Sequence, residues 1–409
     1  MSDPAPSRTA QRLPIEFHGS GKEYFRIWIV NLLLLIVTLT LYYPWARVRK
    51  LTYFAQNTAV AGHPLSFHGQ AKQMFPGFII AMIAAICYFV SQDLFPEFSL
   101  ALLAVYLLIW PWVFRMANRF RMAMTQWRGL RFGFSGTNKG AYTAFLVPLL
   151  VYGAMLGIGA LVGAVGIDPE EMEAMSAEQA GPVFAWFGLM VIVGILAAPY
   201  FLFLIKRYQH SSFAYASLKT RFTGGPGGFY LIAIKTVLLA IAVYVGLILA
   251  ILVIVVLGIV LSGGSISNIE EIGEQIGSQF SLGAVGLLFT IGIGFYVLTY
   301  VMFSAISAYT KSATFNFTWS KTDTDQTHFL PELKFSRLWR LQIKNTLLIL
   351  CTLGLYIPFA QIALARLKLH SLQIETEQDL NTIIADVQTG RTSAVVDAAA
   401  DILDIDIGL

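Results

Sequence analysis

The stretch "TLTLYYPWARVRK", Thr38 to Lys50, ends a run of apolar residues and turns abruptly basic. A near copy, "TLGLYIPFAQIAL", occupies Thr352 to Leu364. At an offset of 314 residues Pro44 corresponds to Pro358, and the tyrosine two positions earlier recurs as well. Such self-similarity predicts that the two stretches are corresponding pieces of the first and last units of a repeated architecture.

Composition places the chain among membrane proteins. Of its 409 residues, 56% are hydrophobic and only 13% are charged, whereas soluble proteins are roughly 45–50% apolar. Several apolar runs reach the ~20 residues that a membrane helix needs. The N-terminal "MSDPAPSRTAQRLP" has no apolar segment, so no cleaved signal peptide is expected. We therefore predict a polytopic protein whose helices pack in lipid.

The distribution of charge predicts the topology. Lys and Arg are absent between positions 72 and 115, 139 and 206, and 235 and 311. Ten acids lie in these spans: Asp93, Glu97, Asp168, Glu170, Glu171, Glu173, Glu178, Glu270, Glu271 and Glu274. The positive-inside rule places the basic segments in the cytoplasm and the acidic loops outside. Three helical hairpins then cross the membrane, 75–92 with 98–118, 140–166 with 182–206, and 228–262 with 281–305, and both termini are cytoplasmic.

The hairpins are joined by connectors of constant length. Three of them, 44–69, 111–136 and 199–224, run 25 positions from a proline to a glycine, with phenylalanine two residues before the glycine. A weaker fourth connector ends at 313–320, and 15–19 and 358–372 keep only one end of the pattern. Each connector reads as a cytoplasmic, basic, amphipathic helix followed by a short strand, because segments such as "RFGFSG" alternate apolar and polar residues.

The predicted fold class is an all-α polytopic membrane protein of repeated helical hairpins, joined by these helix-plus-strand connectors. Residues 1–22 form a cytoplasmic N-terminal segment, 23–374 a membrane domain of five hairpin-like units, and 375–409 an acidic cytoplasmic tail. The first and last apolar runs, 27–46 and 344–366, lack an acidic outer loop. Each either enters to half depth and returns, or crosses once against the positive-inside rule; we favour re-entry, with Thr40 and Gly354 near the bilayer midplane.

A family resemblance rests on "EYFRIWIVNLLLLIVTLTLYYPWARVRKLTYF", Glu23 to Phe54, and on the acidic ending "DAAADILDIDIGL", Asp397 to Leu409. Both resemble the YjgN family of bacterial inner-membrane proteins, a family of unknown function, over essentially the whole chain. The family pattern has glycine where Thr40 stands, and the C-terminal copy has it at Gly354. The resemblance implies a bacterial inner membrane. It brings no established activity and therefore no functional residues.

Two groups of residues are candidates for function. Asn31, Thr38, Asn345 and Thr352 are polar groups in apolar segments, and they either bond across helices or line a cavity. Seven cations near the membrane surface are Arg47, Arg49, Lys50, Arg115, Arg119, Lys206 and Arg207. They either anchor the topology alone or bind the head groups of anionic phospholipids. Cys87 and Cys351 read as packed core thiols.

The sequence leaves the function open. It holds no nucleophile elbow, P-loop or metal-binding motif, so no catalytic residue, metal or cofactor is predicted, and an intramembrane enzyme ranks last. Nucleic acid is not an expected partner. The first hypothesis is transport or handling of a lipid or other amphiphile. The alternative is a membrane scaffold or regulator that acts through the tail, which carries eight acids and one base from Glu375 onward. The oligomeric state stays open.

Overall fold

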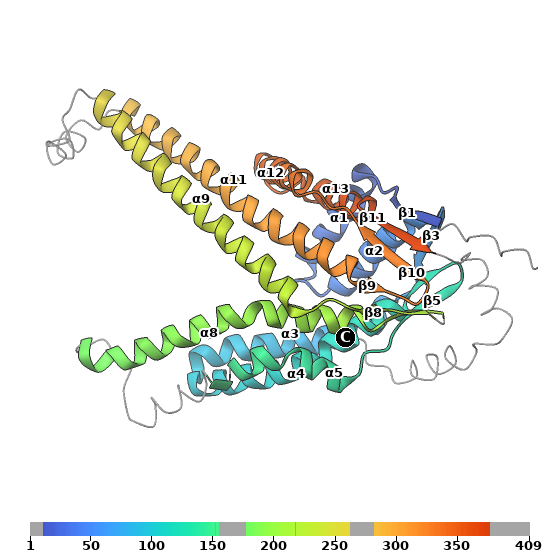
Figure 1. Cartoon of the computed structure of the whole chain (residues 1–409). Helices are drawn as coiled ribbons and strands as arrows, with labels where there is room; N and C mark the ends of the chain where they lie inside the picture. The colour runs from blue at the N-terminus through green and yellow to red at the C-terminus, as the bar shows by residue number, and fades with distance from the viewer. Residues whose placement is uncertain (1–10, 152, 155–176, 217, 262–281, 377–409) are drawn as a thin grey trace, which may run out of the picture. The chain divides into compact units, whose positions relative to one another are not determined.

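The structure, a computed structural model, describes residues 11–151, 153–154, 177–216, 218–261 and 282–376 (Figure 1). Its helices are α1 (Gly21–Val37), α2 (Tyr43–Gln56), α3 (Ala71–Leu94), α4 (Pro96–Ala123), α5 (Asn138–Ala144), α8 (Ala177–His210), α9 (Pro226–Leu261), α11 (Leu282–Ser320), α12 (Phe335–Cys351) and α13 (Ile357–His370). Its strands are β1 (Gln11–Phe17), β2 (Thr58–Val60), β3 (His63–Phe67), β4 (Thr125–Trp127), β5 (Leu130–Phe134), β6 (Phe213–Tyr215), β7 (Leu218–Lys219), β8 (Arg221–Phe222), β9 (Thr322–Asp323), β10 (Thr327–Pro331) and β11 (Leu372–Thr376).

All of these strands belong to one eleven-stranded antiparallel sheet, in the order β7-β6-β5-β4-β3-β2-β1-β11-β10-β9-β8. The two edge strands, β7 and β8, are separated in the chain only by Thr220, so the sheet is a nearly closed ring. The prediction of an all-α fold is therefore wrong. The connectors do end in strands, but these strands pair with one another and build a second structural layer.

Pairing between connectors has a simple physical cause. A two-stranded ribbon leaves unpaired backbone groups along both edges, and an isolated ribbon is marginally stable in water. Along the chain a strand pair follows each pair of helices, so every ribbon finds its neighbours at its own edges. The ends of the chain complete the series, because β1 pairs with β11 from Gln11↔Thr376 to Pro14↔Gln373.

Tight turns connect the two strands of the β2–β3 and β4–β5 ribbons. Ala61 and Gly62 connect β2 to β3 with φ angles of 50° and 77°, and Arg128 and Gly129 connect β4 to β5 with 48° and 83°. Two consecutive positive φ angles are the mark of a type I′ turn, whose twist matches that of paired strands.

The closing phenylalanine and glycine of the connectors have a packing role. In four segments the phenylalanine ring folds back over the glycine, so that a Cβ there would lie 2.6 Å from the ring. The pairs are Phe17 with Gly19, Phe67 with Gly69, Phe134 with Gly136, and Phe222 with Gly224. The residue between them donates its backbone N–H to a carbonyl just past the end of a later helix. Four such bonds of 2.8–2.9 Å join His18 to Asn57, His68 to Met124, Ser135 to Ser212, and Thr223 to Lys321. A fifth bond at the equivalent place joins Glu332, which has no flanking phenylalanine and glycine, to Ser371 at 2.7 Å.

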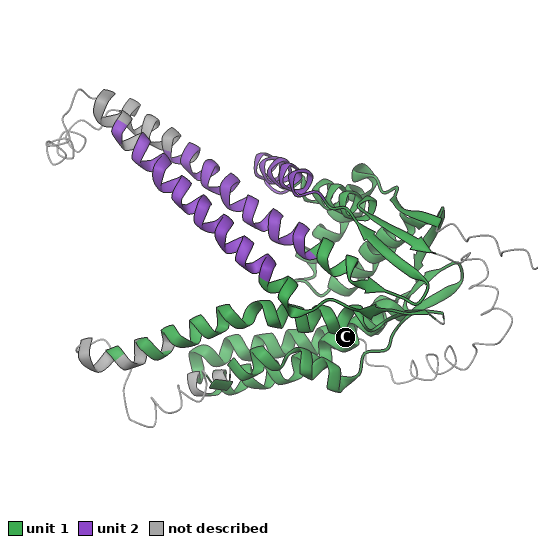
Figure 2. Cartoon of the chain, in the orientation of Figure 1, with its two compact units in different colours: residues 1–230, 315–333, 355–409 green, residues 231–314, 334–354 purple. Residues whose placement is uncertain are grey.

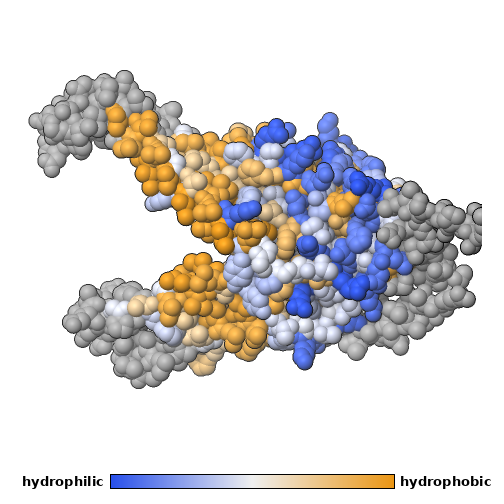
Figure 3. All heavy atoms as spheres, viewed as in Figure 1, coloured by the Kyte–Doolittle hydropathy of each residue, from blue (hydrophilic) through white to orange (hydrophobic). Residues whose placement is uncertain are grey.

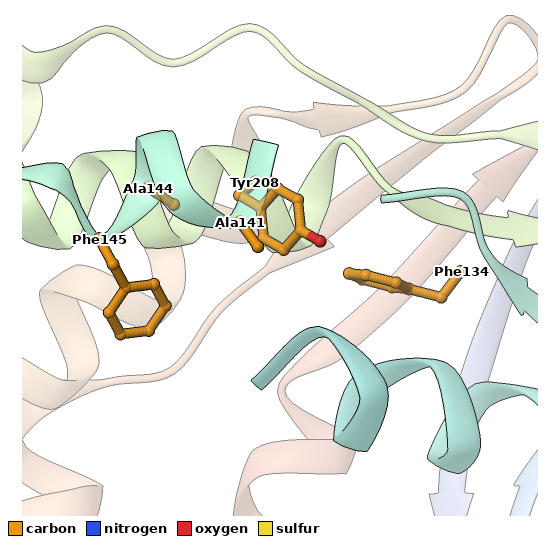
Figure 4. Close-up of a cluster of buried hydrophobic side chains, with 5 residues drawn as sticks. All are labelled: Phe134, Ala141, Ala144, Phe145 and Tyr208. Carbon is orange, nitrogen blue, oxygen red and sulfur yellow. The ribbon is translucent and has the colours of Figure 1, made fainter. Parts of the chain in front are cut away.

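The chain forms two compact units (Figure 2). Unit 1 comprises Met1–Tyr230, Phe315–Leu333 and Leu355–Leu409, and it contains the whole sheet. One of its cores packs α5 and Tyr208 of α8 against Phe134 of β5 (Figure 4). Unit 2 comprises Leu231–Thr314 and Lys334–Gly354. In unit 2, Tyr300 of α11 shares a hydrogen bond with Thr346 of α12, and Trp339 Nε1 donates to Ser304 Oγ at 3.0 Å.

Four helical stretches are long and apolar enough to cross a membrane: Ala71–Leu94, Ala101–Ala123, Gly188–His210 and Pro226–Val253. They overlap four of the six predicted crossings. A fifth prediction, 281–305, falls on helix α11, whereas most of 140–166 and the acidic segments 168–176 and 270–274 lie outside the described residues. In unit 1, hydrophobic residues gather over the helical parts that extend away from the sheet (Figure 3). Cys87 and Cys351 are exposed, not packed as predicted, because they lie on apolar surfaces that suit lipid.

Candidate functional site

The site is built from four helices of unit 1 that each lead directly into a strand of the ring. They are α2, α4, α8 and α13, which precede β2, β4, β6 and β11. Helices α2 and α13 contain no Asp or Glu, and α4 and α8 contain none beyond their first turns. Their basic side chains therefore have no acidic residue on the same stretch of helix to neutralise them.

Helices α2 and α13 meet through polar side chains. Lys50 Nζ donates to Gln361 Oε1 at 2.7 Å, and the Tyr24 hydroxyl donates to the same oxygen at 3.3 Å. The Lys50 ammonium also lies 5.8 Å from the centre of the Phe54 ring. Burial lowers the pKa of Lys50, and the nearby positive charge of Arg47 lowers it further. The Lys50 ammonium is thus partly removed from water and lies near a second positive charge.

Like charges from different helices approach one another here. Arg47 of α2 repels Arg121 of α4, and Lys206 of α8 repels Lys368 of α13. We use the name inner basic cluster for these two pairs of cations. The strands that follow α8 and α13 are β6 and β11, which are not adjacent in the ring, since β7, β8, β9 and β10 lie between them on the shorter path. The approach of Lys206 to Lys368 therefore spans the ring and does not follow from neighbouring strands.

Carboxylates of the described residues form their ion pairs elsewhere. These pairs join Arg12 to Glu375, His18 to Glu16, Arg221 to Asp325, and His328 to Asp323. Arg121 is exposed to solvent. Cations gathered in this way attract anions strongly, because surrounding low-dielectric protein focuses their field.

The structure separates the seven predicted cations into groups. Arg47 and Lys50 lie together on α2 and Lys206 joins Lys368, as described. Arg119 lies near Arg115, whose Nε donates to the Gly136 carbonyl at 2.6 Å. Arg49 and Arg207 are exposed and lie over the rings of Tyr42 and Phe203, at 5.5 and 5.9 Å. That these cations bind lipid head groups stays a prediction.

The four predicted polar residues lie in or beside short helices. Asn31 is 7% exposed and accepts a bond from Arg49 Nη1 at 3.4 Å, which joins α1 to α2. The Thr38 hydroxyl donates to the Leu34 carbonyl and the Thr352 hydroxyl to the Leu348 carbonyl, each at 2.6 Å. Asn345 is buried on α12. Both threonines thus fix helix ends; whether the four residues line a cavity stays a prediction.

The two turns that follow these threonines have the same backbone. Leu39 and Leu353 both have φ 48°, and Thr40 and Gly354 have φ 71° and 93°. The N–H of Thr40 donates to Leu35 at 2.7 Å, as that of Gly354 does to Ile349 at 2.8 Å. The six-to-one bond and left-handed residues are those of a Schellman helix end.

Sequence reasoning missed two members of the cluster. Neither Arg121 nor Lys368 is among the seven cations predicted from the sequence. A signal was available, because Arg121 follows Pro111 by ten residues and Lys368 follows Pro358 by ten. Aligning the connectors on their prolines would have placed both side chains at the same helical position. Among the described residues, no three potential metal ligands gather.

Comparisons with known proteins agree with the membrane character of the chain. It is 32% identical over 184 residues to the inner membrane protein YjgN of Escherichia coli K12, a match that covers 44% of each chain. It is 27% identical over 202 residues to the protein of that name in Salmonella typhimurium LT2, with 48% of each chain covered. The matched region thus spans less than half of these relatives.

No solved structure matches the chain. A family model described as "Bacterial protein of unknown function (DUF898)" matches residues 12–402. This match and the named relatives confirm the resemblance that the N-terminal motif indicates. The chain therefore belongs to the DUF898 family of bacterial proteins of unknown function.

Proposed function

We propose that this chain is a multi-pass protein of the bacterial inner membrane that handles or transports a lipid or another anionic amphiphile. One observation carries the proposal: the membrane-length apolar stretches of α4 and α8, Ala101–Ala123 and Gly188–His210, contain Arg121 and Lys206 of the inner basic cluster near their C-terminal ends. An amphiphile with an anionic head needs both surfaces at once, an apolar one for its chains and a cationic one for its head group.

In the proposed topology the sheet and both termini are cytoplasmic, and three long helical hairpins cross the membrane. The segregation of acids from Lys and Arg supports this orientation, and the pairing of β1 with β11 is compatible with both ends on one side. Reporter fusions at positions 176 and 268 are expected to report an external location, and fusions at both termini a cytoplasmic one. A cytoplasmic signal at position 176 or 268 would overturn the topology.

We also propose that the two short terminal hairpins enter the membrane to half depth. Supporting residues are the exposed leucines of their turns, Leu39 at 82% and Leu353 at 95%. The 17 residues of α1 rise about 26 Å, short of a ~30 Å hydrocarbon core. After replacement of both cysteines, Thr40→Cys and Gly354→Cys are expected to resist an impermeant thiol reagent added from outside. Strong labelling of both would instead indicate a thin full crossing.

A five-unit internal repeat accounts for several features together. Each unit would consist of a helical pair and a strand pair, with β1 and β11 forming the strand pair that the chain ends divide. The five equivalent backbone bonds that begin at His18, His68, Ser135, Thr223 and Glu332 support this organisation. So do the matching turns at Thr40 and Gly354.

The functional test measures lipid movement. The purified chain is reconstituted into vesicles that contain a head-group-labelled anionic phospholipid, and a membrane-impermeant quencher reports passage between leaflets. Transport predicts accelerated loss of protected fluorescence relative to empty vesicles and to vesicles with a labelled phosphatidylcholine. Identical rates of fluorescence loss in all three kinds of vesicle would contradict the proposal that the chain transports the anionic lipid.

The second candidate is a scaffold or regulator that acts through the acidic tail, 375–409, of which residues 377–409 lie outside the described residues. The favouring observation is charge complementarity, because this segment is acidic whereas the inner basic cluster is cationic. Truncation after Thr376 separates the candidates. A transport pathway would keep its flux in the truncated chain, whereas a scaffold would lose its partner and never show flux.

A further inference from the structure

The ring of strands has one face packed on helices and one face turned to solvent. Side chains alternate between the two faces along a strand, and residues that pair across strands share a face. Phe134 is 8% exposed and packs in the core with Tyr208. Its neighbour Gly133 pairs with Ala214, which pairs with Lys219, and a Cβ on Gly133 would lie 3.4 Å from that of Ala214. These three residues therefore form one row on the solvent side, which we call the outer face.

Exposed cations gather on the outer face from β5 to β9. Arg131 lies on β5 two positions before the glycine of this row, and Arg221 lies on β8 two positions after Lys219, so both share the face of the row. Lys321 precedes β9 and lies opposite Thr223, whose backbone N–H donates to the Lys321 carbonyl at 2.8 Å. We use the name basic arc for these four exposed cations: Arg131, Lys219, Arg221 and Lys321.

Most of the basic arc has no acidic partner among the described residues. Within the arc, Arg221 alone forms an ion pair there, with Asp325. The other acids that form ion pairs lie on β1, β9 and β11 and contact an arginine or histidines outside the arc: Glu16, Asp323 and Glu375. The remaining three cations of the arc thus present positive charge to water, where salt screens their mutual repulsion but a polyanion is still attracted.

A polyanion of this kind is part of the same chain. The tail leaves the ring at Thr376 of β11, and β10 and β9 lie between β11 and β8, a separation of about 15 Å at the usual strand spacing. From Glu377 onward the tail holds seven acids and one base. A flexible chain as long as the 20 residues 377–396 has an end-to-end distance of about 25 Å, so the acids that follow can reach the arc.

We propose that the segment 397–406 of the acidic tail docks on the basic arc of its own chain. Three of its acids, Asp397, Asp401 and Asp404, are spaced by four and three residues, the spacing that puts charged side chains on one face of a helix. The glycine and alanine of the outer-face row carry no bulky side chain, so a helix can approach the sheet between the cations. The inference goes beyond both candidate functions, because it assigns the tail a partner within the chain and holds whether or not lipid is moved. Docking covers the arc and withholds the tail from other partners.

Cross-linking of the purified full chain in detergent tests the contact. After Cys87→Ser and Cys351→Ser, the variant Ala214→Cys with Leu403→Cys is treated with a short bismaleimide reagent. The tethering control combines Gln373→Cys with Leu403→Cys, because Gln373 is exposed on β11, the strand from which the tail leaves. Docking is expected to give more intramolecular product at position 214 than at position 373, whereas a tail that is merely tethered gives the reverse. Gel mobility and peptide mass mapping identify the product.

Charge reversal in the variant with cysteines at 214 and 403 tests the chemistry of the contact. Adding Arg131→Glu with Lys219→Glu is expected to lower the cross-linked fraction about 3–10-fold, a loss typical of surface ion pairs, and high salt is expected to lower it as well. Adding Asp401→Lys with Asp404→Lys to the reversed arc is expected to restore the product, which also shows that the reversed sheet is folded.

The matched control, Lys72→Glu with Lys139→Glu, reverses two exposed cations outside the sheet and is expected to leave the cross-linked fraction unchanged. Product that is equal at positions 214 and 373, or that resists reversal of the arc, would overturn the docking. A cross-linked dimer in place of the intramolecular product would assign the arc to the tail of a second copy and overturn docking within the chain. Lipid flux is measured separately, so its absence would contradict transport without changing the cross-linking result.

Discussion

At the scale of single residues, the glycine that closes each connector is required by packing. The Phe67 ring occupies the space that a Cβ on Gly69 would need, at 2.6 Å, and Phe120 lies 3.3 Å from the same point. The sequence shows the spacing of Phe and Gly but not this contact. The residue between them varies from His to Ser and Thr, because the repeated bond uses its backbone N–H. The hydroxyls of Ser135 and Thr223 add a second bond of 3.3 Å to the same carbonyl.

Replacing Gly69 by alanine is expected to destabilise the chain by about 1–3 kcal/mol, the usual effect of overpacking. Thermal unfolding in detergent measures it. Gly194→Ala in α8 is the control, since nothing lies within 4 Å of a Cβ there and alanine favours a helix. Equal unfolding temperatures for both variants would contradict the contact, whereas partial recovery in Gly69→Ala with Phe67→Leu would support it.

Exchanging the residue types of the equivalent turn positions Thr40 and Gly354 is expected to change stability in opposite directions. Thr40 has φ 71°, a left-handed conformation that is unfavourable for a β-branched residue by about 1–3 kcal/mol. Thr40→Gly is therefore expected to raise the unfolding temperature. Gly354→Thr is expected to lower it, because Gly354 has φ 93°. A lower unfolding temperature for Thr40→Gly would show that the two turns do not share this geometry.

At the scale of elements, the connector helices and their terminal strands could be predicted, whereas the sheet could not. Proline, basic residues and five-residue alternation are local signals, and they identify α2, α4 and the strands near Phe67 and Phe134. Strand pairing is non-local: β3 pairs with β4 across a complete helical hairpin. Strands of two to seven residues carry too little pattern to specify a partner. The sequence therefore predicts short strands attached to a helical protein, but not the sheet that they form together.

In the candidate site, too, residues with a local sequence signal could be predicted, whereas contacts between distant segments could not. Arg47, Lys50 and Lys206 were identified because they border apolar runs, a signal that is visible along the chain. Lys368 lies in a connector whose strand is the last in the chain, and its proximity to Lys206 depends on closure of the ring. Asn31 was identified from its polarity, but its bond to Arg49 depends on how α1 and α2 pack.

Within unit 2, a polar seam joins α11 to α12 in otherwise apolar surroundings. The Tyr300 and Thr346 hydroxyls share a hydrogen bond, and a double-mutant cycle of Tyr300→Phe and Thr346→Val is expected to give a coupling energy of about 0.6 kcal/mol. Thermal unfolding of the four chains measures it. Tyr296→Phe replaces Tyr300→Phe in the control cycle, because Tyr296 is 68% exposed. Equal coupling in both cycles would argue against the seam.

At the scale of the whole molecule, closure of the ring depends on the two ends of the chain. β1 holds β11 on one side and β2 on the other, so residues more than 350 positions apart complete one strand pair. The near-identity of "TLTLYYP" and "TLGLYIP" then has a structural reason. The helix–turn–helix segments that contain them follow β1 and precede β11, and thus flank the strands at which the ring is joined.

A cysteine pair tests this closure. Leu13 of β1 lies opposite Ile374 of β11, and Cα atoms of facing residues in antiparallel strands are about 4.5–5.5 Å apart, within disulfide range. After Cys87 and Cys351 are replaced by serine, Leu13→Cys with Ile374→Cys is expected to cross-link under mild oxidation, giving a reducible shift in gel mobility without dimer. Leu13→Cys with Arg131→Cys is the control, because β5 is four strands away from β1 in the sheet. Absence of the intramolecular cross-link, with both thiols reactive toward a small alkylating reagent, would show that the ends do not pair and that the ring is open between the first and last strands.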